Sequence, residues 1–152
     1  NQTFDYGTTF NWGKFTEDYQ DTLTSLYIDY MPDFSKWSHS IGLSYSNQPA
    51  YNFRLDTAAS AAIPDTPEIE SFGIPTLDTA RQFTGGVHLG NRNLFCSEIG
   101  ARAGEAKSMR MAELLLDVNS QYAGGVNVVM LHGFAYSGSY TNTTWPGVTT
   151  FG

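Results

Sequence analysis

Helical and strand-like segments alternate along this chain, and the alternation limits the possible folds more than any other feature. Four short runs, near residues 43–46, 68–71, 93–97 and 127–131, have the length and composition of strands. Each follows a segment with helical features, in residues 14–42, 56–62, 76–83 and 108–123. Strands that alternate with helices in this way predict βα units and a parallel sheet.

Prolines and glycines indicate where the helices begin and end. Pro32 is expected to interrupt the first helical segment and to open a second helix, which Gly42 ends. Gly85-Gly86 is expected to stop the third helix, and Ser108 is expected to cap the last one. The apolar residues of the first and last segments are expected to face the core, namely Tyr19, Leu23, Leu26, Tyr27, Tyr30, Phe34, Trp37 and Ile41, and then Met111, Leu114, Leu115, Val118 and Tyr122.

Polar side chains follow or end all four expected strands. In chain order they are Gln48 and Asn52, then Glu68 and Glu70, then Glu98, and then His132 and Tyr136. Four successive strand ends with convergent polar groups favour a (β/α)8 barrel over an open sheet. A complete barrel needs roughly 250 residues. The 152 residues present therefore predict the second half of a barrel, about strands five to eight, as one partial catalytic domain of a larger chain.

The composition indicates a globular protein and argues against several classes of partner. Hydrophobic residues make up 41% of the chain and charged residues 15%, which argues against disorder. The net charge of −7 argues against a nucleic-acid partner, because affinity for nucleic acids comes from basic patches. No apolar run approaches the roughly 20 residues of a membrane span, so no membrane partner is expected. No phosphate-binding or dinucleotide-binding motif is present, so no organic cofactor is expected.

The single cysteine and two glycosylation sequons bear on the redox state of the thiol and on whether the protein is secreted. Cys96 has no partner for an internal disulfide, and its apolar neighbours predict a buried, unreactive thiol. Sequons for N-glycosylation begin at Asn1 and Asn142. Together with the low charge content, they favour a secreted, extracellular protein that is glycosylated at Asn142.

Two carboxylates on neighbouring strand ends are the minimum that glycoside hydrolysis requires. Glu70 and Glu98 are 28 residues apart, which is one βα step. One carboxyl group protonates the leaving oxygen, while the other activates water or attacks the sugar. The alternative is that both are ordinary acidic residues of surface loops. His132 is expected to lie near Glu98, where it would bind a sugar hydroxyl; the alternative is a structural role. Tyr136 and Trp145 are expected to stack on sugar rings; the alternative is that they belong to the core or to the rim of the site.

Several segments share their motifs with one known family. They are residues 37–43 with Gln48, residues 65–73 (Asp-Thr-Pro-Glu-Ile-Glu-Ser-Phe-Gly), residues 88–93, residues 97–101 (Ser-Glu-Ile-Gly-Ala), residues 125–136 and residues 144–147. Together they extend over most of residues 15–152. They resemble the C-terminal half of the catalytic barrel of glycoside hydrolase family 106, the α-L-rhamnosidases. Residues 125–136 are similar to the last barrel strand of that family.

The resemblance implies an enzyme that inverts configuration at the anomeric carbon and depends on calcium. The Ser-Glu-x-Gly match assigns the general base to Glu98, and the Pro-Glu-x-Glu match places two family carboxylates at Glu68 and Glu70. Glu70 is the leading candidate for the general acid or for a subsite ligand. No motif places the calcium ligands, and residues 137–142 depart from the family pattern, which bears on substrate specificity. The residues expected to bind substrate are Glu68, Gln48, Asn52, His132, Tyr136 and Trp145.

Two other functions fit the same residues. A retaining (β/α)8 glycosidase would use Glu98 as its nucleophile, with carboxyl groups roughly 5–5.5 Å apart instead of the roughly 6.5–9.5 Å of an inverting enzyme. A non-catalytic carbohydrate-binding barrel module would bind sugars through its aromatic residues, and its glutamates would lie on different faces. In each case the partner is a carbohydrate, and the remainder of the same chain completes the barrel.

Overall fold

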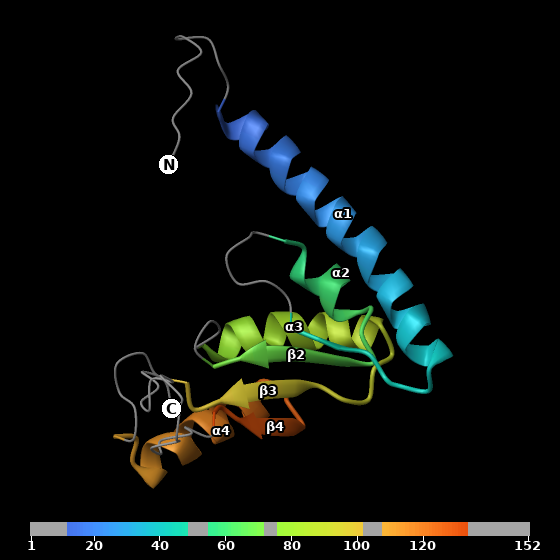
Figure 1. Ribbon diagram of the computed structural model, residues 1–152. Helices are drawn as coiled ribbons and strands as arrows, with labels where there is room; N and C mark the ends of the chain where they lie inside the picture. The colour runs from blue at the N-terminus through green and yellow to red at the C-terminus, as the bar shows by residue number, and fades with distance from the viewer. Residues whose placement is uncertain (1–11, 49–54, 72–75, 102–107, 134–152) are drawn as a thin grey trace, which may run out of the picture.

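The computed structural model describes residues 12–48, 55–71, 76–101 and 108–133. In these residues helices and strands alternate from end to end, as the sequence predicts (Figure 1). The elements are α1 (Trp12–Ser40), β1 (Ser46–Asn47), α2 (Thr57–Ala61), β2 (Thr66–Glu70), α3 (Leu77–Leu89), β3 (Cys96–Ile99), α4 (Met111–Ala123) and β4 (Val128–Leu131). Within this part of the chain, no helix is both long and apolar enough to cross a bilayer.

The four strands form one parallel sheet in the order β1-β2-β3-β4. Sequence order and spatial order agree, because each strand pairs with the next strand of the chain. The predicted βα units and parallel pairing are therefore confirmed. Three strands are shorter than expected, since β1 has two residues and β3 and β4 have four each, whereas β2 has five and begins two residues earlier than expected. The fold is α/β, and its parallel sheet is compatible with half of a barrel.

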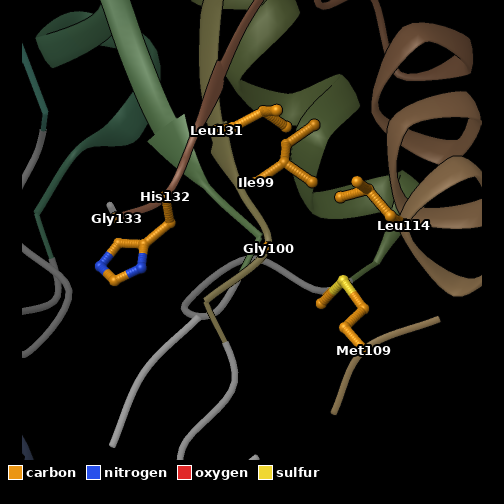
Figure 2. Close-up of a pocket in the computed structure, with 7 residues that line it drawn as sticks. All are labelled: Ile99, Gly100, Met109, Leu114, Leu131, His132 and Gly133. Carbon is orange, nitrogen blue, oxygen red and sulfur yellow. The ribbon is translucent and has the colours of Figure 1, made fainter. Parts of the chain in front are cut away.

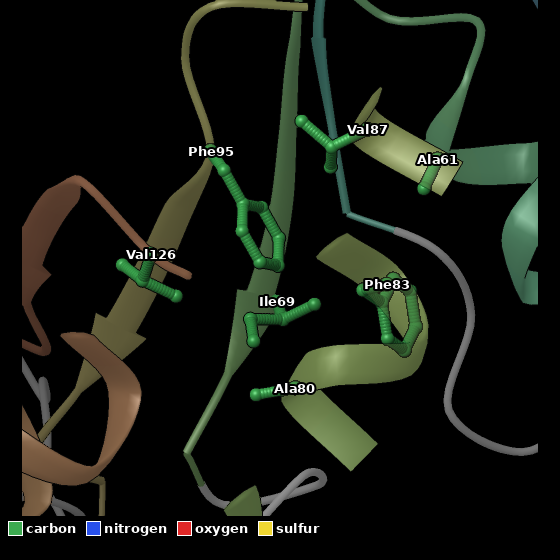
Figure 3. Packing of buried hydrophobic residues seen from close by; sticks show 7 residues of the cluster. All are labelled: Ala61, Ile69, Ala80, Phe83, Val87, Phe95 and Val126. Atoms are coloured by element: carbon green, nitrogen blue, oxygen red, sulfur yellow. The ribbon is translucent and has the colours of Figure 1, made fainter. Parts of the chain in front are cut away.

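One face of the sheet forms the hydrophobic core. In β2 the buried Pro67 and Ile69 alternate with half-buried Thr66, Glu68 and Glu70, which is the two-residue period of a strand. Figure 3 shows Ile69 among side chains of α3 and of the segments that lead into β3 and β4. The core cluster consists of Ala61, Ile69, Ala80, Phe83, Val87, Phe95 and Val126, with Val129 packed against it.

Helix α3 begins as predicted but ends later than predicted. The Thr76 hydroxyl oxygen accepts a hydrogen bond from the Thr79 N–H at 3.2 Å, which caps the helix. The expected stop at Gly85-Gly86 is wrong, because the helix continues to Leu89. Gly86 is instead required by packing against α2: a Cβ atom there would lie 2.4 Å from the Ala58 carbonyl oxygen. The glycine allows two helix backbones to approach closely.

Helix α1 corrects two further expectations. Pro32 lies inside one continuous helix and does not open a second one. A proline removes only one backbone hydrogen bond, and long helical segments flank it on both sides. The predicted apolar stripe does not face the core: Leu26 is 61% exposed and Trp37 56%, while Met31 and Ser38 are buried. The N-terminal part of α1 projects away from the sheet (Figure 1), and most residues of the stripe are exposed.

The C-terminal end of α1 is attached to the sheet through Asp65. The His39 ring Nε2 donates to Asp65 Oδ2 at 2.6 Å, and the Tyr45 backbone N–H donates to the same oxygen at 2.8 Å. The Arg92 guanidinium lies 3.6 Å from Asp65 Oδ1. The predicted helix stop at Gly42 is confirmed, since this residue, two positions after the last helical residue, has φ +80° and its N–H donates to the His39 carbonyl.

Helix α4 has a different cap and a different inner face from those expected. The Arg110 N–H and guanidinium both donate to the Glu113 carboxylate, so the helix is capped at Arg110 and not at Ser108. The inner face contains Leu114, Val118 and the buried Gln121, whereas the other three residues of the predicted stripe, Met111, Leu115 and Tyr122, are exposed. The Ser97 hydroxyl donates to Gln121 Oε1 at 3.2 Å, so a polar contact with β3 sets the orientation of the helix.

Candidate active site

Four of the predicted site positions lie at one edge of the sheet, where the parallel strands end. Gln48 directly follows β1, and Glu70 is the last residue of β2. Glu98 is the penultimate residue of β3, and His132 directly follows β4. The predicted placement of these residues at strand ends is confirmed. The other predicted site residues, Asn52, Tyr136 and Trp145, lie outside the described residues, as does Asn142.

Strand register brings the three glutamates onto one face of the sheet. Glu70 pairs with Glu98, and Glu68 pairs with Cys96. Paired residues of neighbouring strands point to the same side, and residues two apart in one strand do so as well. Glu68, Glu70 and Glu98 are therefore opposite the face that packs on α3 and α4. All three are half-buried.

His132 lies beside Glu98. The distance from His132 Nε2 to Glu98 Oε1 is 4.0 Å, and the two side chains are 26% and 25% exposed. The His132 backbone N–H donates to the Ile99 carbonyl at 2.7 Å, which continues the ladder between β3 and β4 beyond the last strand residue. The expected proximity of His132 to Glu98 is confirmed, and a protonated His132 would form an ion pair with this carboxylate.

The surroundings of Glu68 raise the pKa of its carboxyl group. Burial is the main cause that raises the pKa of its carboxyl group, and the negative charge of Glu98 is the second. Two donors oppose these effects: the Ser46 hydroxyl, 3.5 Å from Glu68 Oε2, and the Cys96 thiol. Because the raising effects prevail, Glu68 keeps its proton to a higher pH than an ordinary glutamate does.

The contact between Cys96 and Glu68 was not foreseen from the sequence. Burial, followed by the charge of Glu68, raises the pKa of the Cys96 thiol to about 11, so the predicted buried and unreactive thiol is confirmed. The thiol lies on the face of the glutamates and not in the hydrophobic core. The two-residue spacing between Cys96 and Glu98 is the sequence signal for this shared face.

An apolar cavity of about 390 Å³ opens at the same edge of the sheet. In Figure 2 the Ile99, Leu114 and Met109 side chains approach one another, while the His132 ring points away from them. His132 therefore both lines this cavity and lies beside Glu98. The cavity is lined by Ile99, Gly100, Met109, Leu114, Leu131, His132 and Gly133.

A second cavity, of about 440 Å³, lies at the opposite edge, where β3 and β4 begin. Its lining is polar, but its main cation is engaged in structure: Arg92 donates to the carbonyl oxygens of Ala62 and Ile63. Asn127 also bridges two backbone groups there, since it accepts from the Phe95 N–H and donates to the Asn93 carbonyl. These contacts indicate a structural role for this edge of the sheet.

Neither a metal centre nor a known relative identifies the site. Within residues 12–48, 55–71, 76–101 and 108–133, no three His, Cys, Asp or Glu side chains are grouped closely enough to hold a metal ion. The expected calcium therefore finds no group of three such side chains in the part of the chain that the structure describes. Comparisons with protein-family models, curated proteins and solved structures found no match to the chain.

Proposed function

We propose that this chain forms the second half of a (β/α)8 glycoside hydrolase of the inverting α-L-rhamnosidase type, with Glu98 as the general base. One observation carries the proposal. Glu70 and Glu98 lie at the edge where neighbouring parallel strands end, and Glu68 shares their face two residues earlier in β2. In parallel α/β enzymes this edge carries the catalytic groups.

Hydrolysis needs one carboxyl group that donates a proton and one carboxylate that accepts a proton from water. Strand β3 supplies Glu98, whose neighbour His132 becomes its ionic partner when protonated. Strand β2 supplies the proton donor from Glu68 or Glu70. Glu98 takes the proton of the attacking water, and the glycosidic oxygen leaves with the proton from β2.

The sugar would be bound by polar and aromatic groups at the same strand ends. The Gln48 side-chain Nε2 is buried and has no hydrogen-bond partner among the described residues, which supports a role for this donor in binding a sugar hydroxyl. His132 is a second candidate donor or acceptor for a hydroxyl. We also assign sugar contacts to Asn52, Tyr136 and Trp145.

A retaining glycosidase is the second candidate, and register gives it specific support. Glu70 and Glu98 are directly opposite, so their backbones are about 4.8 Å apart. A directly opposed pair can bring its carboxyl groups closer together than a diagonal pair, as a retaining enzyme with Glu98 as the nucleophile requires. A carbohydrate-binding module has less support. Its glutamates would lie on different faces of the sheet, whereas Glu68, Glu70 and Glu98 share one face.

We propose that the remainder of the same chain completes the barrel around this sheet. The edge strand β4 supports this assignment, since Met130 and Leu131 are 51% and 63% exposed. Exposed apolar residues on an edge strand are an aggregation hazard that proteins normally cover. We also propose that the protein is secreted and glycosylated at Asn142, and that calcium supports activity through ligands outside the described residues.

The proposal is tested with the full-length protein and aryl glycosides of different sugars. Release of rhamnose from phenyl α-L-rhamnoside, with little turnover of other glycosides, is the expected result. Proton NMR at early times should detect β-rhamnose as the first product of inversion; α-rhamnose would instead identify the retaining mechanism. Hydrolysis of another glycoside with rhamnosides untouched would overturn the rhamnosidase assignment, and no turnover of any glycoside would favour the binding module.

Calcium is tested separately from substrate choice. Removal of divalent cations by a chelator should reduce the rate, and added calcium should restore it while magnesium does not. A rate that the chelator leaves unchanged would remove calcium from the proposal without affecting the carboxylate chemistry.

A further inference from the structure

We infer that Glu68, and not Glu70 at the tip of β2, is the proton donor that works with Glu98. This inference rests on the proposed glycoside hydrolase function and deepens it. It decides between the two carboxyl groups of the Pro-Glu-x-Glu segment, of which Glu70 is the leading candidate from the sequence. Three observations lead to it: the strand register, the partners of the carboxyl group, and the charges that face it.

Register gives the two candidate pairs different separations. Glu68 is opposite Cys96, so Glu98 lies two residues further along the neighbouring strand. A rise of about 3.3 Å per residue and a strand spacing of about 4.8 Å put the backbones of Glu68 and Glu98 about 8 Å apart. The diagonal pair is therefore the more widely separated of the two, as an inverting enzyme with a water between its carboxyl groups requires. Glu70 is only one strand spacing from Glu98.

The partners of Glu68 hold its carboxyl group in place. The Ser46 hydroxyl approaches Oε2 from β1, and the Cys96 thiol donates from β3. Contacts from both neighbouring strands restrict the orientations that this carboxyl group can adopt. Fixed orientation is a requirement for proton transfer in the transition state.

The surrounding charges favour a protonated Glu68. The carboxylates of Glu98 and Glu70 both face it, and their repulsion adds to its partial burial. These causes raise the pKa of Glu68, which a general acid needs at neutral pH. Glu98, in contrast, has His132 as a neighbour. Carboxyl groups with such different environments are expected to divide the acid and base roles.

The reaction is balanced with these two residues alone. The Glu68 O–H gives its proton to the glycosidic oxygen as the bond from that oxygen to the anomeric carbon breaks. Water forms the new bond to the anomeric carbon and loses a proton to Glu98. One water is consumed, and solvent returns the proton from Glu98 to Glu68 after the products leave.

Two substrates with different leaving groups test the assignment in the full-length protein. Dinitrophenolate is a good leaving group and needs no proton. The phenyl glycoside is cleaved much faster when an acid protonates its glycosidic oxygen, so that phenol leaves. For Glu68→Gln we expect kcat/KM for phenyl α-L-rhamnoside to fall by about 10²–10⁴-fold. The rate with dinitrophenyl α-L-rhamnoside should stay close to that of the unsubstituted enzyme. The decline at high pH that the unsubstituted enzyme shows with phenyl α-L-rhamnoside should disappear in this variant.

Glu70→Gln is the matched control, since it makes the same change two residues away on the same face. It should affect both substrates alike and keep the decline at high pH. If Glu70→Gln shows the leaving-group pattern and Glu68→Gln does not, the inference is wrong although the protein is a glycosidase. If the unsubstituted protein hydrolyses neither substrate, the proposed function fails first.

The unsubstituted enzyme provides a test that does not depend on folding of a variant. With phenyl α-L-rhamnoside, kcat/KM should decline at high pH as the acid loses its proton. With the dinitrophenyl substrate this decline should be much weaker. Identical profiles for both substrates would contradict proton donation by any carboxyl group, Glu68 included.

Discussion

Glu70 and Glu98 are directly opposite each other on two neighbouring parallel strands, on the side of the sheet away from α3 and α4. Like charges in opposed positions destabilise a sheet. Glu68, two residues from Glu70, adds a third carboxyl group to the same face. Such a cluster is unfavourable for folding, and this is why we interpret it as functional.

Glu98→Gln should abolish most turnover without unfolding the protein. Glutamine keeps the shape of the side chain but cannot accept the proton of the attacking water. We expect kcat to fall by about 10²–10⁴-fold, and equally for substrates with good and poor leaving groups. Steady-state kinetics measures the effect, and circular dichroism checks the fold. Near-normal kcat in the folded variant would exclude Glu98 as the base.

Gly86→Ala and Gly85→Ala should change stability in opposite directions. An alanine methyl at Gly86 would meet the Ala58 backbone, and the shift required should cost about 1–3 kcal/mol. Among the described residues nothing lies within 4 Å of a Cβ at Gly85, where alanine should stabilise the helix by about 0.5–1 kcal/mol. Urea unfolding of both variants measures the difference. Equal effects would contradict close packing of α2 on α3.

Asp65 should make folding stability depend on pH in the acid range. The Tyr45 backbone N–H is the main cause that lowers the pKa of Asp65, and the contact with His39 adds to it. Because the folded pKa is below the unfolded value, this stability is complete above about pH 4. It is lost as the pH falls through the folded pKa. Urea midpoints between pH 2 and pH 7 should decline less steeply for Asp65→Asn; an unchanged slope would disprove the linkage.

Cys96 should resist alkylation in the folded protein. With a thiol pKa of about 11, only roughly one molecule in a thousand carries the reactive thiolate at pH 8, and burial blocks the reagent further. Iodoacetamide should therefore label Cys96 quickly in urea and very slowly without it. Mass spectrometry at timed intervals follows the reaction. Labelling at the same rate in both conditions would mean that the thiol is not protected.

Features that depend on local sequence were predictable, and features that depend on packing between elements were not. The alternation of helices and strands follows from the spacing of apolar residues and from turn residues such as Gly42. The positions of Glu98 and His132 at strand ends follow in the same way. Gly86 misled the prediction, because its role becomes apparent only when α2 lies against α3.

Two other errors have the same origin. The apolar residues of α1 were expected to be buried because of their spacing, but spacing does not indicate whether a neighbour lies against the helix. Trp37 is accordingly more than half exposed. The inner face of α4 is set by the contact of Gln121 with Ser97, and no apolar pattern indicates a buried glutamine.

The register of β2 against β3 limits where the protein can tolerate an inserted or deleted residue. Side chains alternate between the two faces, so a shift of β2 by one residue would turn Ile69 outward and bury Glu68 and Glu70. A single-residue insertion or deletion in the turn between α2 and β2 risks this inversion. The segments that follow the strands are not under the same restriction. Natural variation in length is therefore expected after the strands and not in residues 62–65.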